Sequence, residues 1–140
     1  MKASNVFSFS FKGVYAKHRP RFYINKLGMT RAYTPQSTKE AETFVRMAFL
    51  SQGGKPLKGY IGIKIETYRK MTKASPGHFD TRKPDADNIA KLILDALNGY
   101  AYMDDKQVVM LAVEKRNIEE GEPYTTVKLR SIDYLKGEEK

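Results

Sequence analysis

DADNIAKLILDALNG, residues 85–99, predicts an amphipathic helix with a defined end. Its apolar residues recur at intervals of three and four, the spacing of one helix face. These residues are Ile89, Leu92, Ile93, Ala96 and Leu97. The pair Asn98-Gly99 is typical of a helix terminus, so we expect the helix to run from about Asp87 to Asn98. A helix with one apolar stripe needs a sheet or a second helix to cover it.

Strand patterns lie on both sides of this helix. Residues 6–11 place three phenylalanines on one face at period two, and residues 60–68 alternate isoleucines with polar residues. We expect these two strands to lie side by side. Residues 108–113 and 124–132 predict two further strands. A second helix is expected from Thr34, its cap, and Pro35, its first helical residue, to about Ser51.

The element order is therefore β-α-β-α-β-β, which predicts the α+β class. We expect a mixed sheet of about four strands with two helices packed on one face. The whole chain, residues 1–140, is predicted to be a single domain, because its length suits one core and no linker or repeat divides it. A basic loop region is expected over 13–35 and a frayed tail over 136–140.

The charge distribution points to a polyanion as partner. The chain has 25 Lys and Arg against 16 Asp and Glu, a net charge of +9, and its first 39 residues contain no carboxylate side chain. Such an acid-free basic segment suits nucleic acid, although a general solubilising charge is the alternative. No segment approaches the roughly 18 apolar residues of a membrane helix, and cysteine is absent. We therefore expect a cytoplasmic protein without membrane contact, in which any metal is held by oxygen ligands.

Two basic segments are candidates for contact with the DNA backbone. The first, residues 13–35, interleaves cations with aromatic residues, which can contact the phosphates and the bases of a nucleic-acid strand. The alternative is that the rings are core residues of a short hairpin. The second is a loop over residues 70–83 that leads into the helix. The predicted DNA-binding residues are Lys17, Arg19, Arg21, Lys73, Arg82 and Lys83.

Carboxylates flank the predicted helix at both ends. Asp85 and Asp87 precede it, Lys91 follows Asp87 by one turn on the same polar face, and the pair Asp104-Asp105 comes shortly after it. Carboxylates that converge in a basic protein suit Mg²⁺ held against a phosphodiester. The alternative is that Asp87 caps the helix, Lys91 pairs with Asp95, and the acidic pair forms a turn. These residues alone leave the two interpretations equal.

Convergence requires the chain to fold back after the helix. We expect Asp104 or Asp105 to approach the helix start if the next strand runs antiparallel to the helix. Asp105 would then meet Asp85 and Asp87.

The same residues resemble the RusA family of Holliday junction resolvases. The pattern is D-x-D-N, a Lys four residues after the second Asp, a helix ending in D-A-L, and an acidic pair followed by x-Q-V. It is matched here, in order, by Asp85, Asp87, Asn88, Lys91, Asp95-Ala96-Leu97, Asp104-Asp105 and Gln107-Val108. The segment Lys17-His18-Arg19-Pro20-Arg21 is similar to one branch of the family.

The resemblance implies a homodimer that nicks two symmetry-related strands of a four-way DNA junction. By motif position it implies that Asp85, Asp87 and Asp105 bind metal, with Asp104 as a further candidate ligand. Lys91 would be the essential basic residue. The expected cofactor is Mg²⁺, with Mn²⁺ as a substitute.

The sequence thus predicts a Mg²⁺-dependent endodeoxyribonuclease that resolves four-way junctions in recombination and repair. One alternative is a nuclease for other branched or flap DNA, because the same site hydrolyses any phosphodiester presented to it. Another is a non-catalytic, basic DNA-binding phage accessory protein.

Overall fold

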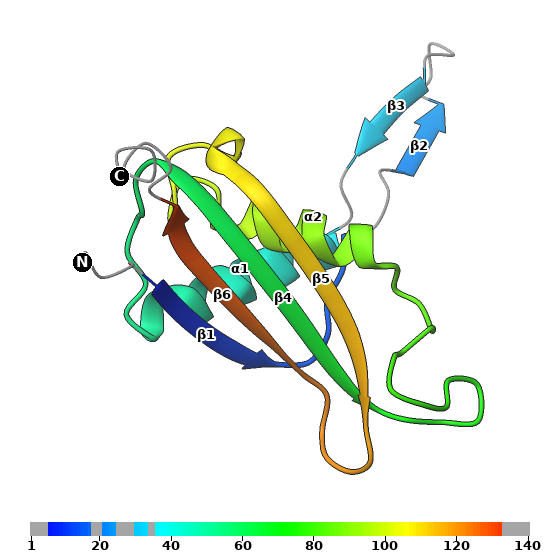
Figure 1. The fold of residues 1–140 in the computed structure, drawn as a ribbon. Helices are drawn as coiled ribbons and strands as arrows, with labels where there is room; N and C mark the ends of the chain where they lie inside the picture. The colour runs from blue at the N-terminus through cyan, green and yellow to red at the C-terminus, as the bar shows by residue number, and fades with distance from the viewer. Residues whose placement is uncertain (1–5, 18–20, 25–29, 34–35, 133–140) are drawn as a thin grey trace.

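The computed structural model describes residues 6–17, 21–24, 30–33 and 36–132, and Figure 1 shows their arrangement. This part of the chain forms two α-helices, one short 3₁₀ helix and six strands. In order they are β1 (Val6–Lys12), β2 (Arg21–Ile24), β3 (Thr30–Tyr33), α1 (Gln36–Ser51), β4 (Tyr60–Lys70), α2 (Ala86–Leu97), the short 3₁₀ helix η1 (Asp105–Gln107), β5 (Val108–Ile118) and β6 (Tyr124–Ile132). The α+β class is confirmed.

Four strands form one mixed sheet in the order β1-β6-β4-β5. Strand β6 pairs antiparallel with both β1 and β4, whereas β4 and β5 are parallel. A parallel pair needs a long crossover, which α2 provides between β4 and β5. The expectation that β4 lies beside β1 was wrong. Because the crossover places β5 on one edge of β4, the other edge is filled by β6, which separates β4 from β1.

Both helices cover one face of the sheet, as predicted, and Figure 1 shows them together behind the strands. The alternating residues of the strands supply one side of the core and the helical stripes supply the other. Val45 and Phe49 of α1 and the stripe of α2 are buried against the sheet, and Phe9 lies edge-on to Phe49 with ring centroids 5.4 Å apart. Fully buried members include Ile61, Ile65, Leu92, Leu97, Val127 and Leu129.

The boundaries of α2 differ by one residue from those expected. It runs from Ala86 to Leu97, with Asp85 as its N-cap and Gly99 in the left-handed conformation (φ +86°) just after its end. All five apolar positions of the predicted stripe are buried. Helix α1 ends at Ser51 as expected, while the predicted cap Thr34-Pro35 and the predicted tail 136–140 lie outside the described residues.

The basic region 13–35 contains a two-stranded hairpin, β2 paired antiparallel with β3, and is therefore not a loop throughout. Within the described ranges, no helix is long and apolar enough to cross a membrane.

Candidate active site

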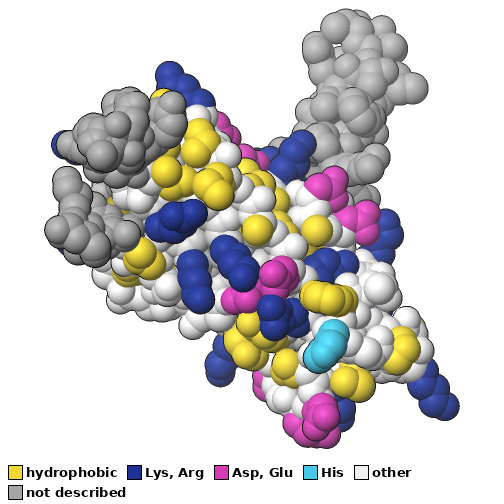
Figure 2. Space-filling model, viewed as in Figure 1, with side chains coloured by type: hydrophobic (Ala, Val, Ile, Leu, Met, Phe, Trp, Pro, Cys, Tyr) yellow, Lys and Arg dark blue, Asp and Glu magenta, His cyan; other side chains and the backbone are white. Residues whose placement is uncertain are grey.

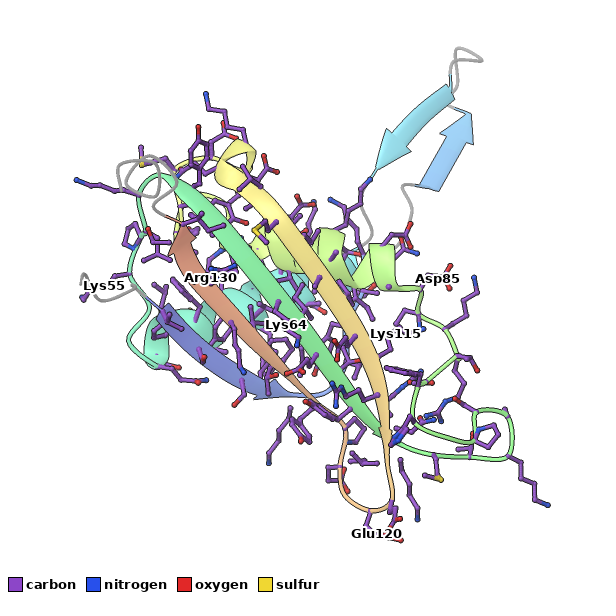
Figure 3. The ribbon with its side chains drawn as sticks, viewed as in Figure 1. Lys55, Lys64, Asp85, Lys115, Glu120 and Arg130 are labelled. Carbon is purple, nitrogen blue, oxygen red and sulfur yellow. The ribbon has the colours of Figure 1, made fainter. Side chains whose placement is uncertain are left out.

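The start of α2 presents two exposed carboxylates. Asp85 has extended backbone (φ −74°, ψ 153°) at the N-cap, but its side chain makes no capping hydrogen bond. Asp87 lies in the first turn and is also exposed. Figure 3 labels Asp85 where the preceding loop joins α2. Free backbone N–H groups make this end of the helix positive, which suits acidic side chains there. One Asp85 oxygen accepts from the Lys83 ammonium (3.2 Å), and both carboxylates are at the surface, where an external cation can reach them.

The acidic pair Asp104-Asp105 lies at the beginning of β5. The Asp104 carboxylate accepts a hydrogen bond from the Lys106 backbone N–H (3.0 Å) and caps η1. This hydrogen bond is the main cause that lowers the pKa of Asp104. Burial raises the pKa of Asp105, and the neighbouring carboxyls of Asp104 and Asp95 add to that rise. Asp105 is therefore electrostatically coupled to the C-terminal half of α2.

The expected closure of Asp105 onto Asp85 and Asp87 does not occur within one chain. Among the described residues, no three Asp, Glu or His side chains are grouped closely enough to hold a metal ion. The reason is the direction of β5: a strand that runs antiparallel to α2 begins beside the end of the helix. Figure 1 shows β5 beginning at the end of α2 opposite to its start, and a twelve-residue helix spans about 18 Å. The structure thus separates the acidic residues into two halves.

Between the two halves, the exposed Lys91 lies one turn after Asp87 on α2. One turn further along, Asp95 forms an ion pair with the ammonium of Lys17, and Glu42 of α1 lies 3.9 Å from the same ammonium. The hydrogen bond to Asp95 is the main cause that raises the pKa of Lys17. Asp95 therefore pairs with Lys17, which links segment 14–17 to both helices.

The loop that leads into Asp85 is anchored by a buried carboxylate. Asp80, 4% exposed, accepts hydrogen bonds from the guanidinium groups of Arg69 (2.7 Å) and Arg82 (2.8 Å). Burial alone would raise the pKa of Asp80, but these hydrogen bonds outweigh it and lower the pKa to about 2. Arg69 also donates to the carbonyl oxygen of Lys83 (2.8 Å), two residues before Asp85, and the Lys83–Pro84 peptide is cis. Asp80 thus fixes the approach to α2.

Strand β5 holds the same loop from its other side. The Asn117 side-chain amide donates to the carbonyl oxygens of Ser75, Gly77 and Phe79 at 2.8–3.0 Å. The Lys115 ammonium donates to the carbonyl oxygen of Arg82 (2.6 Å). Sequence reasoning missed both Asp80 and Asn117. The available signal was one acidic residue in an otherwise basic loop, since a lone carboxylate among cations commonly serves as their shared partner.

The predicted DNA-binding residues have different surroundings. Lys73 is exposed, and the Lys83 side chain is 86% exposed, 3.2 Å from Asp85. The guanidinium of Arg82 is engaged with Asp80, with the carbonyl oxygen of Lys70 (2.9 Å) and with Asn117 (3.2 Å). Lys17 is engaged with Asp95 as described above. Arg21 begins β2, and Arg19 lies outside the described residues.

An open cleft of about 660 Å³ adjoins the start of α2. It is lined by Tyr15 and its neighbours, by the first turns of α1 including Phe44, and by Lys83-Pro84. The Lys17 backbone N–H donates to the carbonyl oxygen of Asn88 (2.9 Å), so segment 14–17 forms a wall that runs along α2. The cleft therefore opens next to the exposed carboxylates.

Gln107 fixes the acidic pair to the rest of the fold. Its side-chain oxygen accepts from the backbone N–H groups of Met103 (2.9 Å) and Asp104 (3.2 Å), and its side-chain NH₂ donates to the carbonyl oxygens of Leu57 (3.3 Å) and Gly59 (3.0 Å). The family pattern drew attention to Gln107, and the structure shows its positioning role.

Gln107→Ala is expected to lower the free energy of unfolding by about 1–2 kcal/mol, because these hydrogen bonds are lost. It should also accelerate amide hydrogen exchange at Met103 and Asp104. Denaturant unfolding and exchange measured by NMR check both effects. Gln107→Glu, which retains the accepting oxygen, should protect these two amides better than Gln107→Ala. Equal exchange in wild type and Gln107→Ala would contradict the assigned role.

The donor set of the two halves suits a hard cation. Mg²⁺ is commonly held by one or two carboxylates and keeps several waters, so the pair Asp85 and Asp87 fits it without a complete protein cage. The same composition excludes thiolate ligation, because the sequence contains no cysteine. The site therefore offers oxygen ligands and an adjacent ammonium, that of Lys91.

Comparison with known proteins identifies the family of the chain. Residues 13–130 match the family model described as Endodeoxyribonuclease RusA, which spans both acidic halves and the anchored loop. The chain is also 33% identical to the uncharacterized protein YqaN of Bacillus subtilis (strain 168) over 132 residues, which covers 84% of this chain and 89% of the relative. On the extent of the family match, the chain belongs to the RusA endodeoxyribonuclease family.

Proposed function

We propose that this protein is a Mg²⁺-dependent endonuclease that resolves four-way DNA junctions by paired, symmetric nicks. The supporting observation is the pair of exposed carboxylates, Asp85 and Asp87, at the start of α2 in a chain of the RusA family. Their position at the end of an anchored loop favours a fixed site over a mobile acidic turn. A role in recombination and repair, in the cytoplasm, follows from such a substrate.

In this proposal Asp85, Asp87 and Asp105 hold the divalent cation, Mg²⁺ or Mn²⁺, with Asp104 as a further ligand. When bound, the cation polarises the phosphate and lowers the pKa of a coordinated water. Lys91, one turn from Asp87, stabilises negative charge on the scissile phosphate. Lys73 and Lys83 contact the DNA backbone from the anchored loop, residues 70–83. Arg19 and Arg21 contact the DNA backbone from the basic region 13–35.

The two acidic halves support a homodimer. A two-fold axis places the same elements of two copies antiparallel to each other. If that axis crosses α2, the start of the helix in one copy, with Asp85 and Asp87, lies beside the end of the helix in the second copy, where Asp104 and Asp105 follow. The partner's Asp105 would then lie beside Asp85 and Asp87. Three carboxylates could thus hold one cation in a composite site although they are far apart within one chain.

Cleavage assays on defined DNA test the proposal. The purified protein is incubated with four-way, flap and linear duplex DNA in Mg²⁺ or in EDTA, and the nick positions are mapped. Paired nicks confined to the four-way junction and absent in EDTA are expected. Cleavage of flaps instead would point to a nuclease for other branched DNA, whereas binding without cleavage at any Mg²⁺ or Mn²⁺ concentration would overturn the enzymatic assignment.

A further inference from the structure

The face of the sheet opposite the helices carries a basic hollow that the candidate site does not use. The strand register places the outward side chains in rows across the sheet. One row is Val6, Arg130, Gly62 and Met110, and the next is Ser8, Lys128, Lys64 and Ala112. The hollow, of about 540 Å³, is lined by residues of both rows. Figure 3 labels Arg130 and Lys64 on this face.

Apolar residues and three cations line the hollow together. Gly62 of β4 has no side chain. On β5, its partner is Met110, and the next outward residue is Ala112. Lys128 and Arg130 are exposed. Within the described part of the chain, neither of them forms an ion pair with a carboxylate. The Arg130 side chain lies over Gly62 and donates to the Met110 sulfur (3.9 Å). The charges of Lys128 and Arg130 are therefore presented to an anionic ligand at the surface of the sheet.

Further along the same face, cations and carboxylates pair with each other. Glu66 and Glu114 lie 3.7 and 3.6 Å from the Lys64 ammonium, and Arg116 pairs with Glu114 at 2.5 Å. Among the outward cations of the four strands, Lys70 pairs with Glu120 of the turn after β5. The other five, Lys12, Lys64, Arg116, Lys128 and Arg130, face the two carboxylates Glu66 and Glu114, a net charge of +3. Figure 2 shows dark blue side chains over this face, with one magenta group among them. The excess charge is concentrated at the hollow.

We propose that this open sheet face, through Lys128 and Arg130, binds the phosphate backbone of a DNA duplex arm. The inference rests on the proposed function, because it assumes a DNA substrate. Row positions place the hollow at the start of β5, the end that carries Asp104-Asp105. An arm on this face therefore lies next to one acidic half of the site.

Charge and ring geometry distinguish this partner from two others. A second copy of the chain would place the same cations against each other in a two-fold interface, which costs free energy. Single strands are usually bound by exposed aromatic rings on which bases stack. Two of the aromatic residues on this face, Tyr68 and Tyr124, stack on each other with centroids 4.5 Å apart. The face thus offers charge for phosphates and few free rings for bases.

Salt-dependent binding tests the proposal without any cleavage. Lys128→Glu/Arg130→Glu is compared with Lys39→Glu/Lys55→Glu, which changes the net charge equally at exposed positions outside the sheet. Affinities for linear duplex, four-way junction and single strand are measured in EDTA by fluorescence anisotropy at several salt concentrations. Loss of two phosphate contacts lowers the slope of log K against log salt by about 1.8 for duplex and junction. The neutral pair Lys128→Gln/Arg130→Gln should lose the same slope, and circular dichroism verifies folding.

A slope change no larger than that of the control pair would overturn the proposal. An effect on single strands alone would overturn it as well, as would a change of oligomeric state in sedimentation caused by the substitutions. Binding is measured in EDTA and requires no cleavage. If the wild type failed to cleave junctions, the proposed function would be refuted, but the binding data would still decide whether this face contacts DNA.

Discussion

Asp87→Asn is expected to reduce junction cleavage by at least about 100-fold. Substitution of residues that only support a metal ligand costs 10- to 100-fold, and loss of the proposed ligand itself should cost no less. Binding of the junction in EDTA should remain or become tighter, because one negative charge facing the phosphates is removed. Single-turnover cleavage and anisotropy measure the two effects.

The matched control is Glu122→Gln, which removes one carboxylate from the exposed turn between β5 and β6. It should cleave like the wild type. If Asp87→Asn cleaved the junction at the wild-type rate, Asp87 would have no role in the chemistry, and the carboxylates at the start of α2 would be helix-terminal charges only.

Mixing two inactive variants distinguishes a composite site from a site within one chain. In a composite site, an exchanged dimer of Asp87→Asn with Asp105→Asn has one intact set of carboxylates, and random exchange yields about half mixed dimers. Nicking of one strand should then return without paired incision. No recovery after exchange of subunits, verified by mass, would contradict the composite arrangement.

Asp80→Asn is expected to lower the free energy of unfolding by about 3 kcal/mol. Removal of one partner from a buried ion pair costs 3–5 kcal/mol, and the lower end applies because the Arg69 and Arg82 side chains are 22% and 23% exposed. For a domain of this size the melting temperature should fall by roughly 10 °C. Glu120→Gln, which disrupts an exposed pair with Lys70, should change the stability by less than about 0.5 kcal/mol.

The low pKa of Asp80 also gives its contribution a defined pH window. The folded-state pKa is about 2 and the reference value is 3.8, so the ionised form is favoured in the folded state. The resulting stability, about 2 kcal/mol, is fully present above the reference value and is lost as the pH falls from about 4 to 2. Denaturant unfolding at several pH values should show this loss in the wild type. An equal loss in Asp80→Asn would contradict the assignment to Asp80.

Periodicity predicted the elements of the fold well because it depends only on which residues face the core. The stripe of α2 and the alternation in β6 are local patterns, and both elements lie within a residue of the expected bounds. The prediction that β4 lies beside β1 was wrong because the order of strands in a sheet depends on the crossover through α2 and on where the last strand is added. No local pattern contains that information.

Which residues form the site stays a prediction, whereas the distances between the candidates could be seen only in the structure. Residue types and spacing identified Asp85, Asp87, Lys91 and the acidic pair, whereas the direction of β5 decides which of them meet. The anchor of the loop was missed for a different reason. Asp80 and Asn117 are 37 residues apart in sequence and meet through Arg82 only in the folded chain.

Strand order also constrains how this protein reaches its native state. Within the four-stranded sheet, β1 pairs only with β6, so that Phe9 and Val127 are partners although 118 residues separate them. Contacts of such separation slow folding, because a large loop must close before they form. During synthesis β1 therefore has no strand partner until nearly all of the described chain has left the ribosome, although Phe9 can already contact Phe49 of α1. The parallel pair of β4 and β5 can form before β6 exists, whereas the β1 edge of the sheet is completed last.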